Sequence, residues 1–178
     1  VSASIELVDS DGNSEGFVAQ SGVDWWSMFH HDLRHTGYST SKAPNTNSTL
    51  WSYSTGSYVY SSPAIADGRL YIGSYDKKVY CINASTGSFI WSYTTGNYIS
   101  YSSPAVADGR VFIGSLDYKV YALNASTGAL IWNYTTGNLV DSSPAVADGK
   151  VYIGSRDWKV YALNASTGAL IWNYTTGS

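Results

Sequence analysis

The stretch SSPAVADGKVYIGSRDWKVYALNASTGALIWNYTTG, residues 142–177, decides the fold of this chain because closely similar copies precede it. Residues 102–137 differ from it at only four positions, and residues 61–96 differ at more. A tryptophan recurs every 40 or 41 residues, at Trp51, Trp91, Trp132 and Trp172. A period of about 40 to 45 residues is typical of the blades of a β-propeller.

Each copy divides into four short segments with the pattern of β-strands, which we call A to D. In the last copy, strand A is Ser-Pro-Ala-Val-Ala, and Asp148-Gly149 closes it with a tight hairpin turn. Strand B is expected at Lys150–Gly154, which shows the period-2 alternation of a β-strand. Strand C is expected at Lys159–Leu163 and strand D at Ala169–Tyr174, with Asn-Ala-Ser-Thr-Gly as the turn between them.

The composition agrees with an all-β fold and excludes several classes of protein. The chain has 16 Tyr, 7 Trp and 17 Gly among 178 residues, which suits pleated strands joined by tight turns. Its net charge of -3 indicates no excess of basic residues for binding phosphates, so we expect no nucleic-acid partner. No apolar run approaches the roughly 18 residues of a transmembrane segment. The single cysteine, Cys81, excludes an intrachain disulfide and a cysteine-rich metal site.

The repeated run Ala-Asp-Gly-x-Val-Tyr-Ile-Gly-Ser-x-Asp-x-x-Val-Tyr-Ala-Leu-Asn-Ala-x-Thr-Gly-x-x-x-Trp resembles the PQQ-like repeat over residues 49–178. That repeat occurs in quinoprotein dehydrogenases, in outer-membrane assembly lipoproteins and in archaeal and bacterial surface proteins. The resemblance implies a propeller arc of four-stranded antiparallel blades, at about 61–96, 102–137 and 142–177. A partial blade precedes them, because Leu50–Gly56 repeats the signal of strand D alone. The resemblance also implies that one tryptophan per repeat docks between adjacent blades, namely Trp51, Trp91, Trp132 and Trp172.

Residues 1–48 do not follow the repeat. Ile5–Val8 and Gly16–Gln20 have the pattern of a hairpin, while residues 40–48 are polar and loop-like. The run Trp26–Ser39 resembles the segment that precedes the repeats in archaeal members of the family. We expect an N-terminal hairpin or cap, a partial blade or a docking arm.

No residue pattern predicts catalysis or a cofactor. The quinone-dependent relatives carry a vicinal cysteine pair, which this chain lacks, so we expect no quinone and no enzyme activity. The cluster of His30, His31, Asp32 and His35 has no Cys or Glu nearby, and we interpret it as part of the cap rather than as a metal site. Asp9–Glu15 alternates oxygen ligands as calcium loops do, but it lacks their frame and reads better as a polar turn.

An aspartate precedes strand C in every repeat, at Asp76, Asp117 and Asp157. It recurs regularly and has no paired acid or base. This favours a role in the turn, where the carboxylate accepts hydrogen bonds from nearby backbone N–H groups, over a role in catalysis. Six Asn-x-Ser/Thr sequons also occur, most of them through repeat duplication, and a secretory glycosylating context would be needed to modify them. They are Asn47, Asn83, Asn124, Asn133, Asn164 and Asn173.

Positions at which the near-identical copies differ indicate an exposed face. They gather in the B–C turns and in the D–A connections at 97–101 and 138–141, which share one face of an up-and-down propeller. PQQ-like repeats usually carry Gly at the positions of Lys77, Tyr118 and Trp158. Exposed aromatic rings at these positions would mark a binding face. The alternative is that these rings only cover the neighbouring blade. The candidate residues are Tyr75 with Lys77, Leu116 with Tyr118, and Arg156 with Trp158.

These observations predict a non-catalytic, secreted or cell-surface scaffold without a cofactor or metal. An arc of three blades leaves two apolar end faces, so the expected partner is another copy of the chain, and another protein or a glycan is a further candidate. The alternatives are a fragment of a larger quinoprotein-like enzyme or cofactor-binding propeller, and a ligand-sensing ectodomain.

Overall fold

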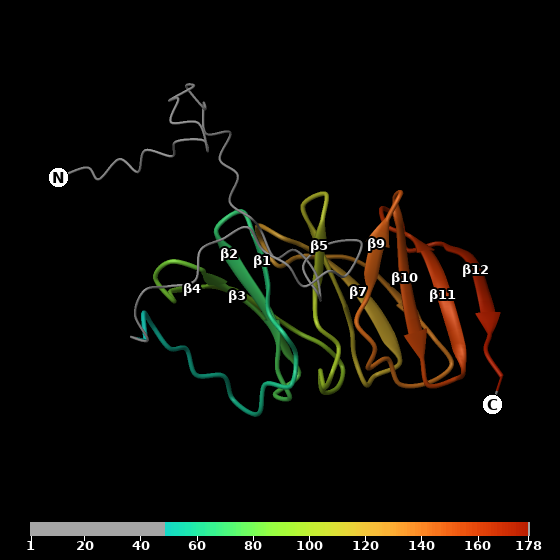
Figure 1. Ribbon diagram of the computed structural model, residues 1–178, viewed down its shortest axis with the longest axis horizontal. Coiled ribbons are helices and arrows are strands. Elements are labelled where there is room, and N and C mark those ends of the chain that lie inside the picture. Colours follow the sequence, from blue (N-terminus) through green and yellow to red (C-terminus); the bar gives the residue numbers. More distant parts are fainter. Residues whose placement is uncertain (1–48, 178) are drawn as a thin grey trace, which may run out of the picture.

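Each repeat folds into its own four-stranded antiparallel sheet. The computed structural model describes residues 49–177 and places the three sheets, here called blades 1 to 3, side by side in an arc (Figure 1). Blade 1 comprises β1 (Ala64–Ala66), β2 (Arg69–Gly73), β3 (Lys78–Asn83) and β4 (Phe89–Thr94). Blade 2 comprises β5 (Ala105–Ala107), β6 (Arg110–Gly114), β7 (Lys119–Asn124) and β8 (Leu130–Thr135). Blade 3 comprises β9 (Ala145–Ala147), β10 (Lys150–Ser155), β11 (Lys159–Asn164) and β12 (Leu170–Thr175). The predicted all-β propeller arc of three blades is confirmed.

Local turn chemistry explains why every blade has the same four strands. In the A–B turn of blade 3, Asp148 and Gly149 have φ angles of 49° and 68°, as a two-residue hairpin turn requires. In the C–D turn, the side-chain oxygen of Asn164 accepts hydrogen bonds from the amides of Ser166 and Thr167. Gly168 then takes a φ of 72°, which lets the chain reverse into strand D.

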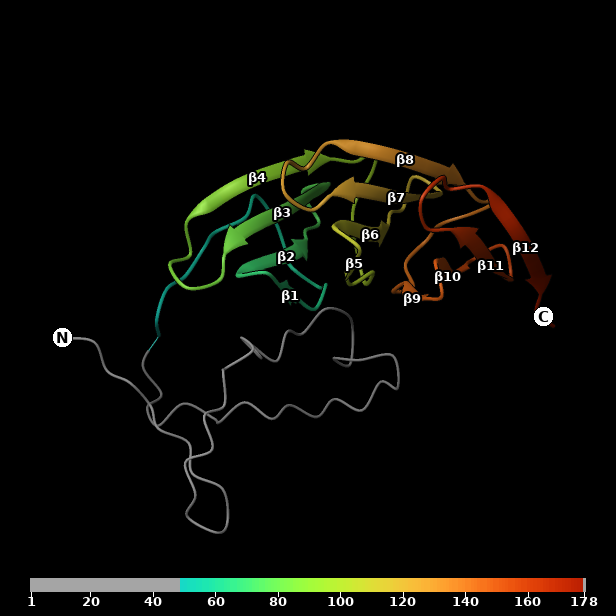
Figure 2. The same cartoon turned by 90° about the horizontal axis from the view of Figure 1, so that it is seen from above.

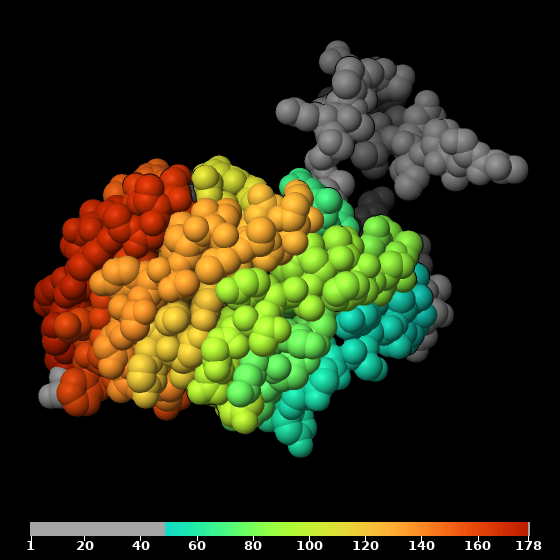
Figure 3. Space-filling model, turned by 180° about the vertical axis from the view of Figure 1, so that it is seen from behind, coloured from blue at the N-terminus to red at the C-terminus, as the bar shows by residue number. Residues whose placement is uncertain are grey.

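The strands of each blade run from the inside of the arc to the outside. Figure 2 shows β1, β5 and β9 on the concave side and β4, β8 and β12 on the convex side. Figure 3, seen from behind, shows the outer strands covering the convex side as successive bands. Residues 49–177 contain no helix that is long and apolar enough to cross a membrane.

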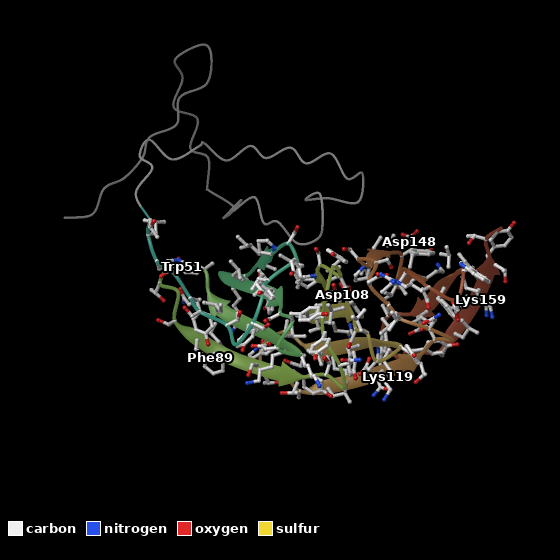
Figure 4. All side chains as sticks on the ribbon, turned by 90° about the horizontal axis from the view of Figure 1, so that it is seen from below. Trp51, Phe89, Asp108, Lys119, Asp148 and Lys159 are labelled. Carbon is white, nitrogen blue, oxygen red and sulfur yellow. The ribbon has the colours of Figure 1, made fainter. Side chains whose placement is uncertain are left out.

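The hydrophobic core lies between the blades rather than within any one sheet. One buried cluster joins blades 1 and 2, and it includes Tyr71, Val79, Trp91, Val111 and Leu123. A second joins blades 2 and 3, and it includes Phe112, Trp132, Val151, Tyr161 and Leu163. Figure 4 shows side chains filling the spaces between neighbouring sheets. Because a blade buries its apolar faces against its neighbours, the outer face of blade 3 lacks a neighbouring blade within residues 49–177.

The segment Leu50–Gly56 does not form the isolated strand that its sequence predicts. It has no sheet partner among the described residues, because strands A to C of its own repeat are missing there. It nevertheless lies against blade 1, since the Trp51 indole donates a hydrogen bond to the Ala84 carbonyl at 3.0 Å. The predicted N-terminal hairpin, the histidine cluster, the Asp9–Glu15 turn and Asn47 lie outside the described residues.

Candidate interaction surfaces

A repeated joint links each blade to the next. Between blades 2 and 3, the Trp132 indole on β8 donates a hydrogen bond to the Ala165 carbonyl at 3.0 Å. Its ring lies directly on Gly168, where an added Cβ would stand 2.7 Å from the ring. The same arrangement recurs with Trp91 on Ala125 and Gly128, and with Trp51 on Ala84 and Gly87.

The second half of the joint is built around the aspartate of the B–C turn. Between blades 2 and 3, the Gly137 amide donates a hydrogen bond to a carboxylate oxygen of Asp157 at 2.9 Å, and the Tyr161 hydroxyl donates to the same oxygen. The other oxygen accepts from the Lys159 amide, which is the expected turn role. The inter-blade role was not predicted, although a sequence signal exists: a tyrosine follows each of these aspartates by four residues.

Hydrogen bonding perturbs the pKa values of this pair in opposite directions. Burial alone would raise the pKa of Asp157, but the hydrogen bonds from Tyr161 and Gly137 outweigh it and hold that pKa below its usual value. Burial, together with the hydrogen bond to Asp157, raises the pKa of Tyr161 to about 12. Asp76 and Tyr80 show the same directions in blade 1. The joint is therefore most stable with the carboxylate ionised and the phenol neutral.

We expect the free energy of unfolding to be highest between about pH 5 and pH 9. A lowered carboxyl pKa stabilises the fold above the unfolded value of about 3.9, and that contribution is lost as the pH falls through the folded pKa. A raised tyrosine pKa stabilises the fold below the unfolded value of about 10, and that contribution is lost as the pH rises toward 12. Urea titrations across pH measure both limbs. The Asp157→Asn variant should show a shallower acid limb, and an unchanged slope would contradict this account.

The fourth copy of the joint, on β12, is open. Trp172 is 43% exposed, whereas Trp132 in the filled joint is 8% exposed. Among the described residues, Trp172 pairs only with the ring of Tyr152 in its own blade, at 6.0 Å. Tyr174, which corresponds to the joint residue Tyr134, is also exposed. The end of blade 3 thus presents a complete docking motif, Trp-x-Tyr-x-Thr-Gly at 172–177, that has no acceptor among residues 49–177.

The face on which the repeat copies differ is formed as expected, by B–C turns beside D–A connections. The amide of Tyr75 donates to the Tyr58 carbonyl at 2.8 Å, and the amide of Leu116 donates to the Tyr98 carbonyl at 2.9 Å. The amide of Arg156 donates in the same way to the Leu139 carbonyl at 2.9 Å. We call this surface the variable face; it lies at the lower edge of Figure 1 and toward the viewer in Figure 4.

The six candidate residues differ in exposure on this face. Tyr118, Arg156 and Trp158 are exposed, while Tyr75, Lys77 and Leu116 are half-buried. Lys77, Tyr118 and Trp158 have φ angles of 73°, 71° and 63°. This left-handed backbone conformation favours glycine, so each of these three larger residues adopts it at a conformational free-energy cost. The Arg156 guanidinium forms an ion pair with Asp141 of the neighbouring connection.

The structure also gathers five tyrosines on the variable face at the boundary of blades 1 and 2. We call them the tyrosine cluster: Tyr58, Tyr60, Tyr75, Tyr98 and Tyr101. The rings of Tyr75 and Tyr98 stack at 4.2 Å, and Tyr60 contacts both Tyr58 and Tyr101 at 5.7 Å. The ammonium of Lys77 lies 5.2 Å from the centre of the Tyr98 ring. Among these five, Tyr75 was a named candidate, and Tyr98 and Tyr101 lie in the 97–101 connection where the copies differ. Tyr58 and Tyr60 were missed because they precede the first complete repeat.

The sequons fall into two structural classes. Asn83, Asn124 and Asn164 are half-buried, and each uses its side-chain oxygen to hold a C–D turn. Asn133 and Asn173 are exposed on the outer strands β8 and β12. The two exposed sites are therefore the more accessible to a modifying enzyme.

Comparison with known proteins identifies the family. The family model described as outer membrane protein assembly factor BamB matches residues 35–178. The chain belongs to this BamB family of PQQ-like propeller repeats. No curated protein matches the chain.

Solved structures similar to this BamB-family chain are PQQ-type propellers. A europium-containing methanol dehydrogenase matches 87% of the chain with a TM-score of 0.75 and 22% identity. BamB from Moraxella catarrhalis matches 72% with a TM-score of 0.64 and 24% identity. Quinohemoprotein alcohol dehydrogenase from Comamonas testosteroni matches 85% with a TM-score of 0.72 and 25% identity. The chain spans 32%, 40% and 27% of these three chains, respectively.

The residues of this BamB-family chain do not fit the quinone site of the dehydrogenases. The chain has one cysteine, so it cannot supply the vicinal pair that the resemblance implies. Cys81 is buried between blades 1 and 2, and burial raises the pKa of its thiol to about 11. Residues 49–177 bring together no group of three His, Cys, Asp or Glu side chains that would hold a metal ion.

Proposed function

We propose that this chain is a non-catalytic scaffold of the cell envelope or cell surface, of the archaeal surface-protein type, and that it assembles end to end. The observation that supports the proposal is the open joint on β12. Trp172, Tyr174 and Gly177 repeat the residues that fill three joints within the chain, and Trp172 and Tyr174 are exposed. An exposed apolar face of this kind marks an interaction site.

A matching acceptor exists on blade 1, and a replaceable segment covers it. Residues 51–56, Trp-Ser-Tyr-Ser-Thr-Gly, carry the same motif as residues 172–177. Trp51 remains half-buried, and its segment has no sheet partner among the described residues. Strand β12 is paired within a complete four-stranded blade, whereas residues 51–56 have no sheet partner among the described residues. Strand β12 of one copy can therefore displace residues 51–56 of another. Such a contact is head-to-tail, and it generates either a ring or a filament.

The mass of the protein in solution tests this proposal. We expect the wild-type chain to exceed the monomer mass of 19.3 kDa increasingly with concentration in size-exclusion light scattering. The double variant Trp172→Ser with Tyr174→Ser should remain monomeric, because both rings of the open joint are removed. The control Leu130→Ser changes an exposed residue on β8, outside the open joint, and should assemble like the wild type. A wild-type monomer at every concentration would contradict the proposal.

A second candidate is a role as part of a longer quinoprotein-like propeller. It is favoured by the fraction of the methanol dehydrogenase that the chain covers, which is 32%. Reconstitution with the quinone and calcium, followed by a dye-reduction assay, distinguishes the two. We expect no quinone-dependent turnover, and robust turnover would favour the second candidate.

A further inference from the structure

The rings of the tyrosine cluster are not needed to hold the connections on which they stand. Tyr58, Tyr98 and Leu139 occupy equivalent places in successive D–A connections. Their carbonyls accept the same backbone hydrogen bond from a B–C turn, at 2.8, 2.9 and 2.9 Å, so a leucine serves there as well as a tyrosine. The residues that follow in the second and third connections, Ile99 and Val140, are fully buried and anchor the chain. The connections therefore do not require tyrosine at these positions.

The rings of the cluster form one exposed platform. All but Tyr75 are exposed, and Tyr58 and Tyr101 are 69% and 61% exposed. The ring of Tyr60 lies 5.7 Å from those of Tyr58 and Tyr101, centre to centre. Tyr75 lies 5.8 Å from Tyr60 and stacks on Tyr98 at 4.2 Å. A further ring would need a gap of about 7 Å between two stacked rings, twice the contact distance, so a ligand has to lie on the platform.

The charges around the platform nearly cancel. Within residues 49–177, four carboxylates and five cationic groups stand in or beside the B–C turns and D–A connections of the variable face. They are Asp76, Asp117, Asp141 and Asp157, and Lys77, Lys78, Lys119, Arg156 and Lys159. The carboxylates keep their charge, because three of them accept hydrogen bonds in the joints and Asp141 pairs with Arg156. The whole chain carries a net charge of -3. This balance favours a ligand without charge.

We infer that the tyrosine cluster binds a neutral polysaccharide made of sugars whose hydroxyl groups are equatorial. Such a sugar presents its axial C–H bonds as a flat apolar face and its hydroxyls around the edge. Tyrosine supplies both counterparts, an apolar ring and a polar hydroxyl. Within residues 49–177, the cluster forms its hydrogen bonds through backbone groups, as at Tyr58 and Tyr98, so the ring hydroxyls are available to a ligand. A platform of several rings suits a chain of sugars that passes across it.

Two other polymers that contact aromatic side chains fit less well. A proline-rich peptide docks in grooves between aromatic residues, whereas the rings of this cluster touch one another and leave no such groove. A single-stranded nucleic acid stacks its bases on aromatic rings, but its phosphates need basic residues in excess. The near balance of charge on the variable face does not supply that excess.

Depletion of the full chain from solution tests the inference, with amorphous cellulose, polygalacturonate beads and polyproline beads as three separate probes. We expect depletion by cellulose only, and to the same extent at low and high salt, because the ligand carries no charge. The double variant Tyr58→Ser with Tyr101→Ser should bind cellulose roughly tenfold more weakly or worse, since two stacked rings are lost. Tyr58→Phe with Tyr101→Phe keeps both rings and should lose less. Leu130→Ser, an exposed apolar residue on β8, should bind like the wild type.

Each other outcome overturns the inference. Binding to polygalacturonate as strong as to cellulose, or binding to cellulose that high salt abolishes, shows that charge recognises the ligand. Binding to polyproline as strong as to cellulose assigns the surface to a peptide. No depletion by cellulose, or undiminished depletion of the double serine variant, removes the site. The Trp172→Ser, Tyr174→Ser variant keeps the tyrosine cluster and should still bind cellulose, so a failure of end-to-end assembly and a failure of this inference are distinguished.

Discussion

Replacing Trp132 by alanine is expected to lower the free energy of unfolding by about 3 to 5 kcal/mol, the range for truncation of a large buried aromatic residue. The ring joins blades 2 and 3, packs on Gly168 and donates a hydrogen bond to the Ala165 carbonyl. Its removal leaves a cavity in the joint and a carbonyl without its partner. Blade 3 should then unfold more easily than blades 1 and 2.

Trp172 provides the matched control for this experiment. It stands at the same position of a nearly identical repeat, but it is exposed at the open end of blade 3. We expect Trp172→Ala to lower the free energy of unfolding of the monomer by about 1 kcal/mol or less, as for most surface changes. Urea denaturation at low protein concentration, followed by circular dichroism, compares the two variants. Equal losses would show that the joint does not stabilise the arc.

Replacing Gly168 by alanine is expected to lower the free energy of unfolding by about 2 to 5 kcal/mol, from backbone strain plus overpacking. Gly168 has a φ of 72°, and an added Cβ would stand 2.7 Å from the Trp132 ring. The ring must therefore leave its position on the C–D turn.

The control for this variant is Gly149→Ala. Gly149 has a φ of 68°, but nothing lies within 4 Å of an added Cβ, so only backbone strain of about 1 to 2 kcal/mol remains. Urea denaturation of the two variants isolates the contact with Trp132. Combining Gly168→Ala with Trp132→Ala should give less than the sum of the two losses, because both changes break the same contact. Equal losses for Gly168→Ala and Gly149→Ala would contradict the proposed packing.

Much of the fold could be predicted from the repeats, because every turn carries its own local signal. The differences lie at strand ends: in blade 3, strand A was predicted at 143–147 and is observed at Ala145–Ala147. Strand D was predicted at Ala169–Tyr174 and is observed at Leu170–Thr175. Ala169 still belongs to the turn, since its carbonyl accepts from the Asn164 amide and its own amide donates to the Thr167 hydroxyl. A sequence pattern marks the apolar alternation but not the last hydrogen bond of the turn.

The interaction surfaces were less predictable because they depend on neighbours in space. Differences between the copies identified the variable face, yet they could not show that Tyr60 contacts both Tyr58 and Tyr101. The inter-blade hydrogen bond of Asp157 likewise requires the position of the preceding blade. Leu50–Gly56 has the pattern of a strand, but a strand needs partners that the pattern does not supply.

A disulfide trap tests end-to-end assembly most directly. In the joint between Leu50–Gly56 and blade 1, an added Cβ on Gly56 would lie 3.3 Å from the Cβ of Asp76. Disulfides join Cβ atoms about 3.5 to 4.5 Å apart, so small adjustments permit a bond there. The intrachain pair Gly56→Cys with Asp76→Cys serves as the control, because it shows that this geometry oxidises. It should also fix residues 51–56 in place and so prevent assembly.

For the measurement, the Gly177→Cys variant and the Asp76→Cys variant are mixed and oxidised. The products are then separated by size under non-reducing conditions. If β12 of one copy displaces residues 51–56 of another, Gly177 takes the place of Gly56 beside Asp76. We predict a covalent dimer that contains one copy of each variant, and its loss when Trp172→Ser is added to the first variant. A mixture that stays monomeric, while the intrachain control oxidises fully, would contradict the account.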